Sequence, residues 1–234
     1  MRFACVDTST FTESVALVEG ETMWGERSVR RPYGHAPGLH ADLRELLDEV
    51  NWTLDSLDGL VIGVGPGSFT GLRVGMAAVK GLAYALGKPI YGIPTSHALL
   101  SALADPREAL ALIDARRGEI YVEGDLISEP RCFTPDKLVE ELLSRGESPR
   151  ILVGEGAIKH QMIFREAWPK VILPLNTATH IPRAALLASG LASDIALGIR
   201  LADDVALLEP IYVRQSDAEI NYPDGFPSEA RLFS

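Results

Sequence analysis

The sequence predicts an α/β protein that is built from two halves of similar plan. Each half opens with short apolar strands joined by tight turns. Each half then continues with segments whose apolar residues recur at helical spacing. Strands that lead into helices in this order give one mixed sheet per half. A chain of 234 residues is long enough to bury a sizeable core.

In the first half, three strands precede a helix, and a fourth strand then leads into a long helix. The second and third strands form a hairpin around Glu19-Gly20. Gly87-Lys88-Pro89 ends the long helix. We predict strands at residues 3–6, 14–18, 22–29, 60–64 and 89–93, a loop at 31–38, and helices at 39–50, 72–86 and 96–104.

The second half repeats this plan, beginning with a hairpin around Arg117-Gly118. We predict strands at residues 109–116, 119–127, 150–153 and 171–175, and helices from Thr134 or Asp136 to 144, at 158–167 and at 182–198. The chain then divides into a first subdomain at residues 1–104 and a second at 105–215, with the apolar 182–198 helix able to pack back on the first. Residues 216–234 are polar and are predicted to form an extended tail.

A glycine-rich turn links the strand at residues 60–64 to the long helix. After Gly65-Pro66-Gly67, either Ser68 or Thr70 can cap the helix start, where free N–H groups and the helix dipole favour an anion. The spacing matches neither standard phosphate loop, because Gly71 is followed by Leu72 rather than by lysine. Two interpretations therefore remain open, namely phosphate binding and a turn that permits close packing.

The long helix is apolar nearly all round, and between residues 72 and 86 only Arg73 and Lys80 carry charge. A helix on the surface of a monomer normally presents one broad polar face. Gly71 and Gly75 share a face and would permit a close backbone approach. The pattern favours a helix that a partner protein covers, the alternative being burial between two layers of the same chain. Arg73 and Lys80 would then contact an acidic partner or a phosphate, or remain solvated.

Composition narrows the function classes. The net charge of −10 argues against direct wrapping of nucleic acid, which requires a lysine- and arginine-rich surface. No apolar run reaches membrane-spanning length, and the chain starts directly with a strand rather than with a signal peptide. Cys5 and Cys132 are expected to be reduced thiols in a cytoplasmic protein.

Two α/β halves that each begin with a hairpin are typical of the actin-like and sugar-kinase (ribonuclease H-like) fold, in which nucleotide binds between the halves. Asp7 ends the first strand, and with Thr8 and Ser9 it is the candidate cofactor-binding group, because a carboxylate and turn hydroxyls can order a hydrated cation. The turn lacks the glycine that usually lets a phosphate approach. The same residues are also typical of an ordinary stabilised turn.

Four segments together resemble the TsaB family, also called YeaZ. They are Asp7-Thr8-Ser9 and residues 65–75, 113–121 and 209–214, within a resemblance that runs from residue 1 to about residue 220. The resemblance implies an actin-like fold and a role in forming threonylcarbamoyladenosine at position 37 of tRNA. It also implies partnership with the catalytic subunit TsaD, which carries the metal, and with the ATPase TsaE, and homodimers formed through helices of the first half.

The histidines distinguish this chain from the catalytic relatives. Relatives of the TsaD type carry a His-x-x-x-His metal pair after the strand that follows the long helix, whereas here His97 is followed by Ser101 at the second position. One imidazole does not make a first-row metal site without further ligands. His35 and His40 are separated by five positions across Pro37-Gly38, which is a poor metal clip. We therefore predict that the metal and the transferase chemistry are absent.

The sequence thus predicts a non-catalytic partner subunit of a TsaD-type transferase. We expect it to contact tRNA only through that partner and to require no cofactor, with ATP or ADP as a candidate ligand at the partner interface. Two helices would pack as a four-helix bundle with the partner or with a second copy. The predicted interface residues are Leu39, Leu43, Leu46, Leu47, Gly67, Ser68, Phe69, Thr70, Gly71, Leu72, Arg73, Gly75, Met76, Val79 and Lys80. The alternatives are an ATPase or kinase that uses Asp7 and, ranked third, a glycopeptidase-like hydrolase.

Overall fold

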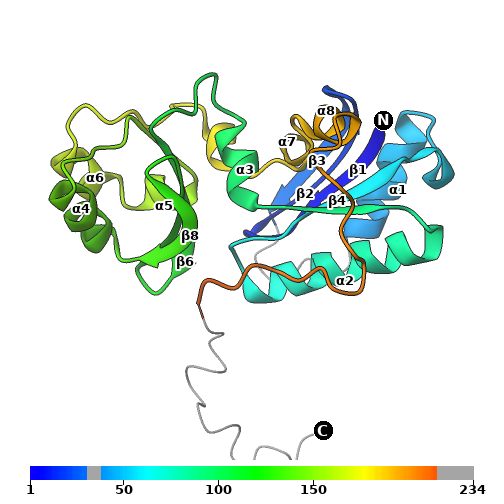
Figure 1. The fold of residues 1–234 in the computed structure, drawn as a ribbon, viewed down its shortest axis with the longest axis horizontal. Helices are drawn as coiled ribbons and strands as arrows, with labels where there is room; N and C mark the ends of the chain where they lie inside the picture. Colours follow the sequence, from blue (N-terminus) through cyan, green and yellow to red (C-terminus); the bar gives the residue numbers. More distant parts are fainter. Residues whose placement is uncertain (31–37, 215–234) are drawn as a thin grey trace, which may run out of the picture.

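The first half of the protein is a five-stranded mixed sheet with helices on both faces (Figure 1). The computed structural model describes residues 1–30 and 38–214. The strand order is β3-β2-β1-β4-β5, in which β1, β4 and β5 are parallel and β2 is antiparallel to both of its neighbours. The strands are β1 (Arg2–Asp7), β2 (Thr12–Glu19), β3 (Thr22–Arg30), β4 (Gly59–Gly63) and β5 (Ile90–Ile93).

Successive side chains of β1 point to opposite faces of the sheet, and at this central strand both faces are buried. Ala4 and Val6 contact one core, which α1 and α2 cover. Phe3 and Cys5 contact the other core, which α3, α7 and α8 cover. The helices are α1 (Leu39–Glu49), α2 (Phe69–Leu86), α3 (Thr95–Leu100), α7 (Ala184–Leu187) and α8 (Leu191–Ala196), with a 3₁₀ turn η1 (Leu54–Ser56) before β4.

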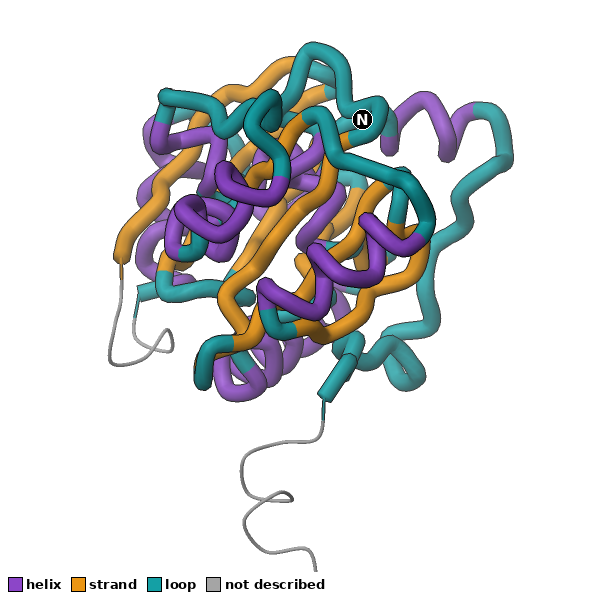
Figure 2. Tube along the Cα trace, turned by 90° about the vertical axis from the view of Figure 1, so that its left-hand side faces the viewer, coloured by secondary structure: helices purple, strands orange, loops and turns teal. Residues whose placement is uncertain are grey.

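The second half contains a four-stranded sheet in the order β8-β7-β6-β9. Helices α4, α5 and α6 cover one face of this sheet and form a separate core with it. Figure 2 shows the helices in purple and the strands in orange after a turn of 90°. The elements are β6 (Ala109–Arg116), β7 (Glu119–Gly124), β8 (Ile127–Phe133), α4 (Pro135–Ser144), β9 (Ile151–Val153), α5 (Glu155–Lys159), α6 (Gln161–Ala167) and a 3₁₀ turn η2 (Thr177–His180).

Helix α3 lies between the two sheets (Figure 1). Ala98 belongs to the core of the first sheet, whereas the next residue, Leu99, packs with Ala111 and Ile113 of β6. The Ser96 hydroxyl also donates a hydrogen bond to the Glu123 carboxylate on β7. One short helix therefore joins the two halves through apolar and polar contacts.

The predicted fold class is confirmed, and so are the hairpin of β2 and β3 and the long helix α2. Helix α2 begins after Ser68, one of the two predicted caps and three residues before the predicted start at residue 72. The Ser68 Oγ accepts from the Gly71 amide N at 3.3 Å, and the helix ends at Gly87 in the left-handed conformation. In residues 1–30 and 38–214, no helix combines the length and the apolar character that crossing a bilayer requires.

Four predicted elements in the second half are wrong in detail. The strand predicted at 119–127 is two strands, because the chain turns after Gly124, where a Cβ would lie 2.2 Å from the Ala109 carbonyl O. The helix predicted at 158–167 begins directly after β9 and breaks at His160. The strand predicted at 171–175 is reduced to one bridge at Ile172. The helix predicted at 182–198 is split into α7 and α8 by Gly190, which has a φ of +75°.

Two other predictions fall largely outside the described residues. These are the loop at residues 31–38, of which only Gly38 is described, and the tail at residues 216–234.

Candidate functional site

The glycine-rich turn between β4 and α2 packs against the turn between β1 and β2. The Ser68 amide N donates to the Ser9 carbonyl O over 2.6 Å, and a Cβ at Gly67 would lie only 2.3 Å from the same oxygen. Gly65 has a φ of +96°, a conformation that favours glycine. These glycines allow a close approach between two segments of the same chain, which is the packing role that the sequence left open.

Asp7 lies at the centre of this contact and is fully buried. Its Oδ1 accepts from the Ser9 amide N at 2.9 Å and from Ser9 Oγ at 2.6 Å, and its Oδ2 accepts from Thr95 Oγ1 at 3.0 Å. Thr95 begins α3, so the carboxyl group ties the first strand to the helix between the halves. Burial raises the pKa of Asp7 to about 6, and the three hydrogen bonds offset only part of this increase.

Thr8 fixes helix α2 onto the same turn. Its Oγ1 donates to the Gly71 carbonyl O at 2.8 Å, and a Cβ at Gly75 would lie 2.2 Å from that Oγ1. Real Cβ atoms do not approach another atom so closely, so this helix face can approach the turn only because glycine stands at position 75.

The three predicted cofactor-binding residues, Asp7, Thr8 and Ser9, come together, but their arrangement does not fit a phosphate or a hydrated cation. All three are buried, and their polar groups bond to Thr95, Gly71 and one another. A magnesium ion that keeps part of its water shell needs oxygen atoms that are open to water. Residues 1–30 and 38–214 also contain no group of three His, Cys, Asp or Glu side chains that could hold a metal ion.

His97, which occupies the place of the relatives' metal pair, faces another part of this chain. Its Nε2 lies 3.2 Å from the Ser189 carbonyl O, between α7 and α8. Ser101 caps the end of α3, and His40 is exposed on α1. His35 lies outside the described residues.

The structure corrects most of the predicted partner interface, because the side chains named for it are buried in this chain's own core. On α1 they are Leu39, Leu43, Leu46 and Leu47, and on α2 they are Leu72, Met76 and Val79. Gly67, Gly71 and Gly75 face the turn after β1 rather than solvent. The helical spacing identified the correct amphipathic helices but could not decide which face the sheet would cover.

A different row of residues on α2 is exposed, and we call Ala77, Gly81 and Tyr84 the docking row. Tyr84 is 84% exposed, and a Cβ added at Gly81 would meet no atom within 4 Å. The spacings of four and three residues place the row on one face. The predicted interface did not include this row. Its position opposite the apolar residues that the sheet covers is the signal that could have identified it.

The edge of α2 is covered by residues 200–214, which we call the strap. The strap descends from α8, passes β5 and runs along α2 toward the second half (Figure 1). The Lys80 Nζ donates to the carbonyl O atoms of Ala206 and Leu208 at 3.1 and 3.0 Å, and the Ile211 amide N donates to the Val64 carbonyl O at 2.8 Å. The Lys80 ammonium group therefore binds the strap of this chain, and its contact with a partner or a phosphate stays a prediction.

Arg73 also contacts the strap. Its Nε donates to the Tyr212 hydroxyl at 3.0 Å, and its guanidinium carbon lies 3.8 Å from the ring centroid of Phe69. Phe69 and Thr70 begin the helix, and Thr70 is exposed. The segment 209–214 was notable in the sequence, but nothing in its pattern showed that it would bind α2.

Comparisons with known proteins place the fold and the family. The family model described as "TsaD: tRNA N6-adenosine threonylcarbamoyltransferase" matches residues 34–222, the greater part of the chain. The TsaB protein of Bacillus subtilis, named as a tRNA threonylcarbamoyladenosine biosynthesis protein, is 27% identical over 236 residues, covering 95% of this chain and 98% of the relative. An uncharacterized protein of Mycobacterium tuberculosis is 30% identical over 216 residues, covering 92% of each chain.

Solved structures support the same family and fold. YeaZ from Pseudomonas aeruginosa is 28% identical and superposes with a TM-score of 0.67 over 91% of this chain and 100% of that one. An activator of a 2-hydroxyisocaproyl-CoA dehydratase from Clostridium difficile, at 11% identity and a TM-score of 0.51 over 87% of this chain and all of that one, shares the fold alone.

The chain belongs to the protein family that contains the tRNA threonylcarbamoyltransferases. Within this family, a transferase of Clostridium botulinum matches only 59 residues, or 17% of its own length, whereas the TsaB protein of Bacillus subtilis matches over nearly its whole length. The chain is a TsaB/YeaZ family member.

The glycines of α2 give a matched pair of stability tests. Gly75→Ala should lower the free energy of unfolding by about 1–2 kcal/mol, because overpacking against Thr8 outweighs the better helix propensity of alanine. Gly81→Ala should raise it by about 0.5–1 kcal/mol, because position 81 is open. Urea unfolding followed by circular dichroism measures both, and equal stability of the two variants would contradict the packing described for α2.

The buried carboxyl group of Asp7 predicts a pH dependence. The folded state keeps the Asp7 carboxyl group protonated up to about pH 6, whereas in the unfolded state its pKa returns to the ordinary aspartate value of 3.8. Asp7 therefore contributes most to the free energy of unfolding below about pH 4. This contribution, which is at most about 3 kcal/mol, is lost as the pH rises to and beyond about 6. The Asp7→Asn variant lacks this titrating group. The stability of the variant relative to that of the wild type should therefore be greater at pH 7.5 than at pH 4.

This difference is measured by urea unfolding of both proteins across the pH range. Other titrating groups, such as the half-buried Glu123 and Glu155, are common to the two proteins and largely cancel. Parallel stability curves for wild type and Asp7→Asn would show that Asp7 is not desolvated as described.

Proposed function

We propose that this chain is a non-catalytic partner subunit that acts with a TsaD-type transferase in the biosynthesis of threonylcarbamoyladenosine in tRNA. Its membership of the TsaB/YeaZ family supports the pathway, because relatives from Bacillus subtilis and Escherichia coli are named as biosynthesis proteins for this nucleoside. The observation that carries the partner role is the docking row on α2. Its residues are uncharged and exposed, and they lie along a helix of 18 residues.

The chemistry of the docking row suits a partner helix. Ala77 and Gly81 leave room for another backbone to approach, and Tyr84 offers a largely exposed ring whose burial would contribute much of the interface energy. The outward side of α1 carries charged residues instead, including Arg44, Glu45 and Asp48. We therefore place the partner on α2, with α1 at the polar rim.

The same docking row would pair two copies of this chain when the transferase is absent. In this proposal the homodimer and the complex with the transferase exclude each other. A TsaE-type ATPase joins the complex rather than the free chain, and the assembly works in the cytoplasm.

The buried arrangement around Asp7 supports the absence of catalysis by this chain. A phosphoryl-transfer enzyme of this fold would need a carboxylate that is open to metal and nucleotide, whereas Asp7 is occupied by Ser9 and Thr95. We propose that ATP or ADP, if it takes part, binds at the seam with the transferase and not to this chain alone.

Gly81→Arg should abolish the complex on a sizing column or weaken it at least about tenfold, because a long cation would fill the space left for the partner helix. The variant should fold at least as stably as the wild type, because position 81 is open and arginine favours a helix more than glycine does. Purified chain and nuclease-treated transferase are mixed, and the complex and the formation of modified tRNA are both measured.

Met162→Arg is the matched control, because Met162 is 78% exposed on α6 in the other half. It should leave both the complex and the modification unchanged. Full-strength binding by Gly81→Arg would exclude the docking row, and equal tRNA modification with and without this chain would exclude the proposed function.

Calorimetry tests the nucleotide proposal. Titration of the full chain with ATP and magnesium ion to millimolar concentration should give no binding heat, because no acceptor of the Asp7 cluster is open to a metal ion. A saturable heat that disappears in Asp7→Asn would favour the ATPase or kinase interpretation instead.

A further inference from the structure

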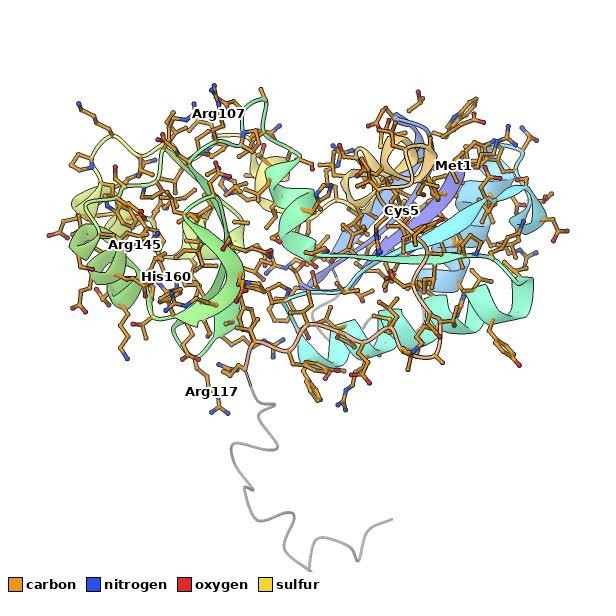
Figure 3. All side chains as sticks on the ribbon, in the orientation of Figure 1. Met1, Cys5, Arg107, Arg117, Arg145 and His160 are labelled. Atoms are coloured by element: carbon orange, nitrogen blue, oxygen red, sulfur yellow. The ribbon has the colours of Figure 1, made fainter. Side chains whose placement is uncertain are left out.

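One surface of the molecule gathers arginine side chains and aromatic rings. It lies where the start of α2, the end of the strap and the β6–β7 turn meet at the lower edge of the molecule, and Arg117 points outward from that edge (Figure 3). We call Phe69, Arg73, Tyr212, Arg116 and Arg117 the arginine face. The mechanism proposed above uses none of these five side chains.

The first part of the arginine face is a cation stacked on two rings. The guanidinium carbon of Arg73 lies 3.8 Å from the ring centroid of Phe69 and 5.7 Å from that of Tyr212. The two rings lie 5.1 Å apart, and Tyr212 is 43% exposed. An exposed ring such as that of Tyr212 and a guanidinium plane such as that of Arg73 are platforms on which nucleic-acid bases stack.

The second part is the turn between β6 and β7. Arg116 and Arg117 have φ values of +62° and +51°, which are strained for residues that carry a side chain. The Arg116 guanidinium carbon lies 4.7 Å from the ring centroid of Phe11, in the turn between β1 and β2. Asparagine or glycine would adopt this backbone at lower cost, whereas here two exposed arginines occupy the turn.

The acidic residues of this turn are held by other cations. Lys159 Nζ donates to both carboxylate oxygens of Asp114, at 2.8 and 2.9 Å. Arg214, two residues after Tyr212, pairs with Glu119, and this pair joins the strap to the turn. The turn itself contributes two exposed arginines, Arg116 and Arg117, to a chain whose overall charge is −10.

We infer that the arginine face binds the phosphate backbone and unstacked bases of tRNA. The choice of RNA rests on the proposed function in tRNA modification, and the exposed Tyr212 ring favours RNA over an acidic protein, which offers no bases to stack. Guanidinium groups form charge-assisted hydrogen bonds with phosphates. The inference departs from the sequence expectation that this chain reaches tRNA only through its partner. Because the rest of the chain is acidic, binding is confined to this face and is weakened by salt.

The test is fluorescence anisotropy of a labelled, unmodified tRNA transcript with the full chain at about 50 mM salt. Arg117→Glu should weaken binding at least about fivefold, and loss of one phosphate contact should lower the salt slope by about one. Tyr212→Ala should also weaken binding, whereas Tyr212→Phe, which keeps the ring, should bind nearly as the wild type does. Glu209→Gln, which removes an exposed acid from the strap, should bind at least as tightly as the wild type.

Arg107→Glu is the matched control. Arg107 has a highly exposed side chain and lies on the opposite side of the second half from Arg117 (Figure 3). The two variants change the net charge equally, so Arg107→Glu should bind tRNA within about twofold of the wild type.

A second variant separates binding from folding. Arg117→Asn should have an unfolding equilibrium constant within about fivefold of the wild-type value, because the better tolerance of asparagine for the left-handed backbone offsets the loss of the arginine side chain. The same variant should weaken tRNA binding at least about fivefold. Weaker binding by a variant of near-wild-type stability is a loss that misfolding does not explain.

Three results would overturn the inference. The first is no tRNA binding by the wild-type chain at low salt, and the second is equal loss of binding in Arg107→Glu and Arg117→Glu. The third is displacement of tRNA by polyglutamate together with full binding by Tyr212→Ala, which would indicate an acidic protein partner. A chain that binds the transferase but no tRNA would reject this inference and leave the proposed function in place.

Discussion

The structure depends on the close contact between helix α2 and the turn that follows β1. Thr8 donates to the Gly71 carbonyl O, and Ser9 accepts from the Ser68 amide, at distances that side chains at Gly67 and Gly75 would forbid. This contact sets the position of the helix on the sheet. It therefore also decides which residues of α2 enter the core and which form the docking row.

The same contact explains why the Asp7 carboxyl group is buried. In an enzyme with a nucleotide between its halves, the end of the first strand must remain open to the ligand. Here the turn hydroxyls and Thr95 surround the carboxyl group, and burial raises its pKa. In this chain, the side chains of Ser9 and Thr95 fill the space around the Asp7 carboxyl group at the end of β1.

The sequence predicted the fold well where the pattern was local. Apolar runs located β1, β4 and β5, and Ser68 and Gly87 marked the ends of α2. It failed where distant segments decide the outcome. Nothing near Lys80 shows that the carbonyl groups of the strap, more than 120 residues later, will bind its ammonium group. The apolar residues of α2 were likewise assigned to a partner because the sequence did not reveal which side the sheet would cover.

Helix α3 and the late helices α7 and α8 make the two halves inseparable as fragments. Ala98 and Leu99 are neighbours in the chain but belong to different cores, and Ala184 and Leu187 complete the core beneath β1. A gene cut after residue 104 would yield a first sheet with one apolar face covered only by α3, and such a fragment would aggregate. The polypeptide must be synthesised beyond Leu191, which also packs in this core, before its opening strands are fully enclosed.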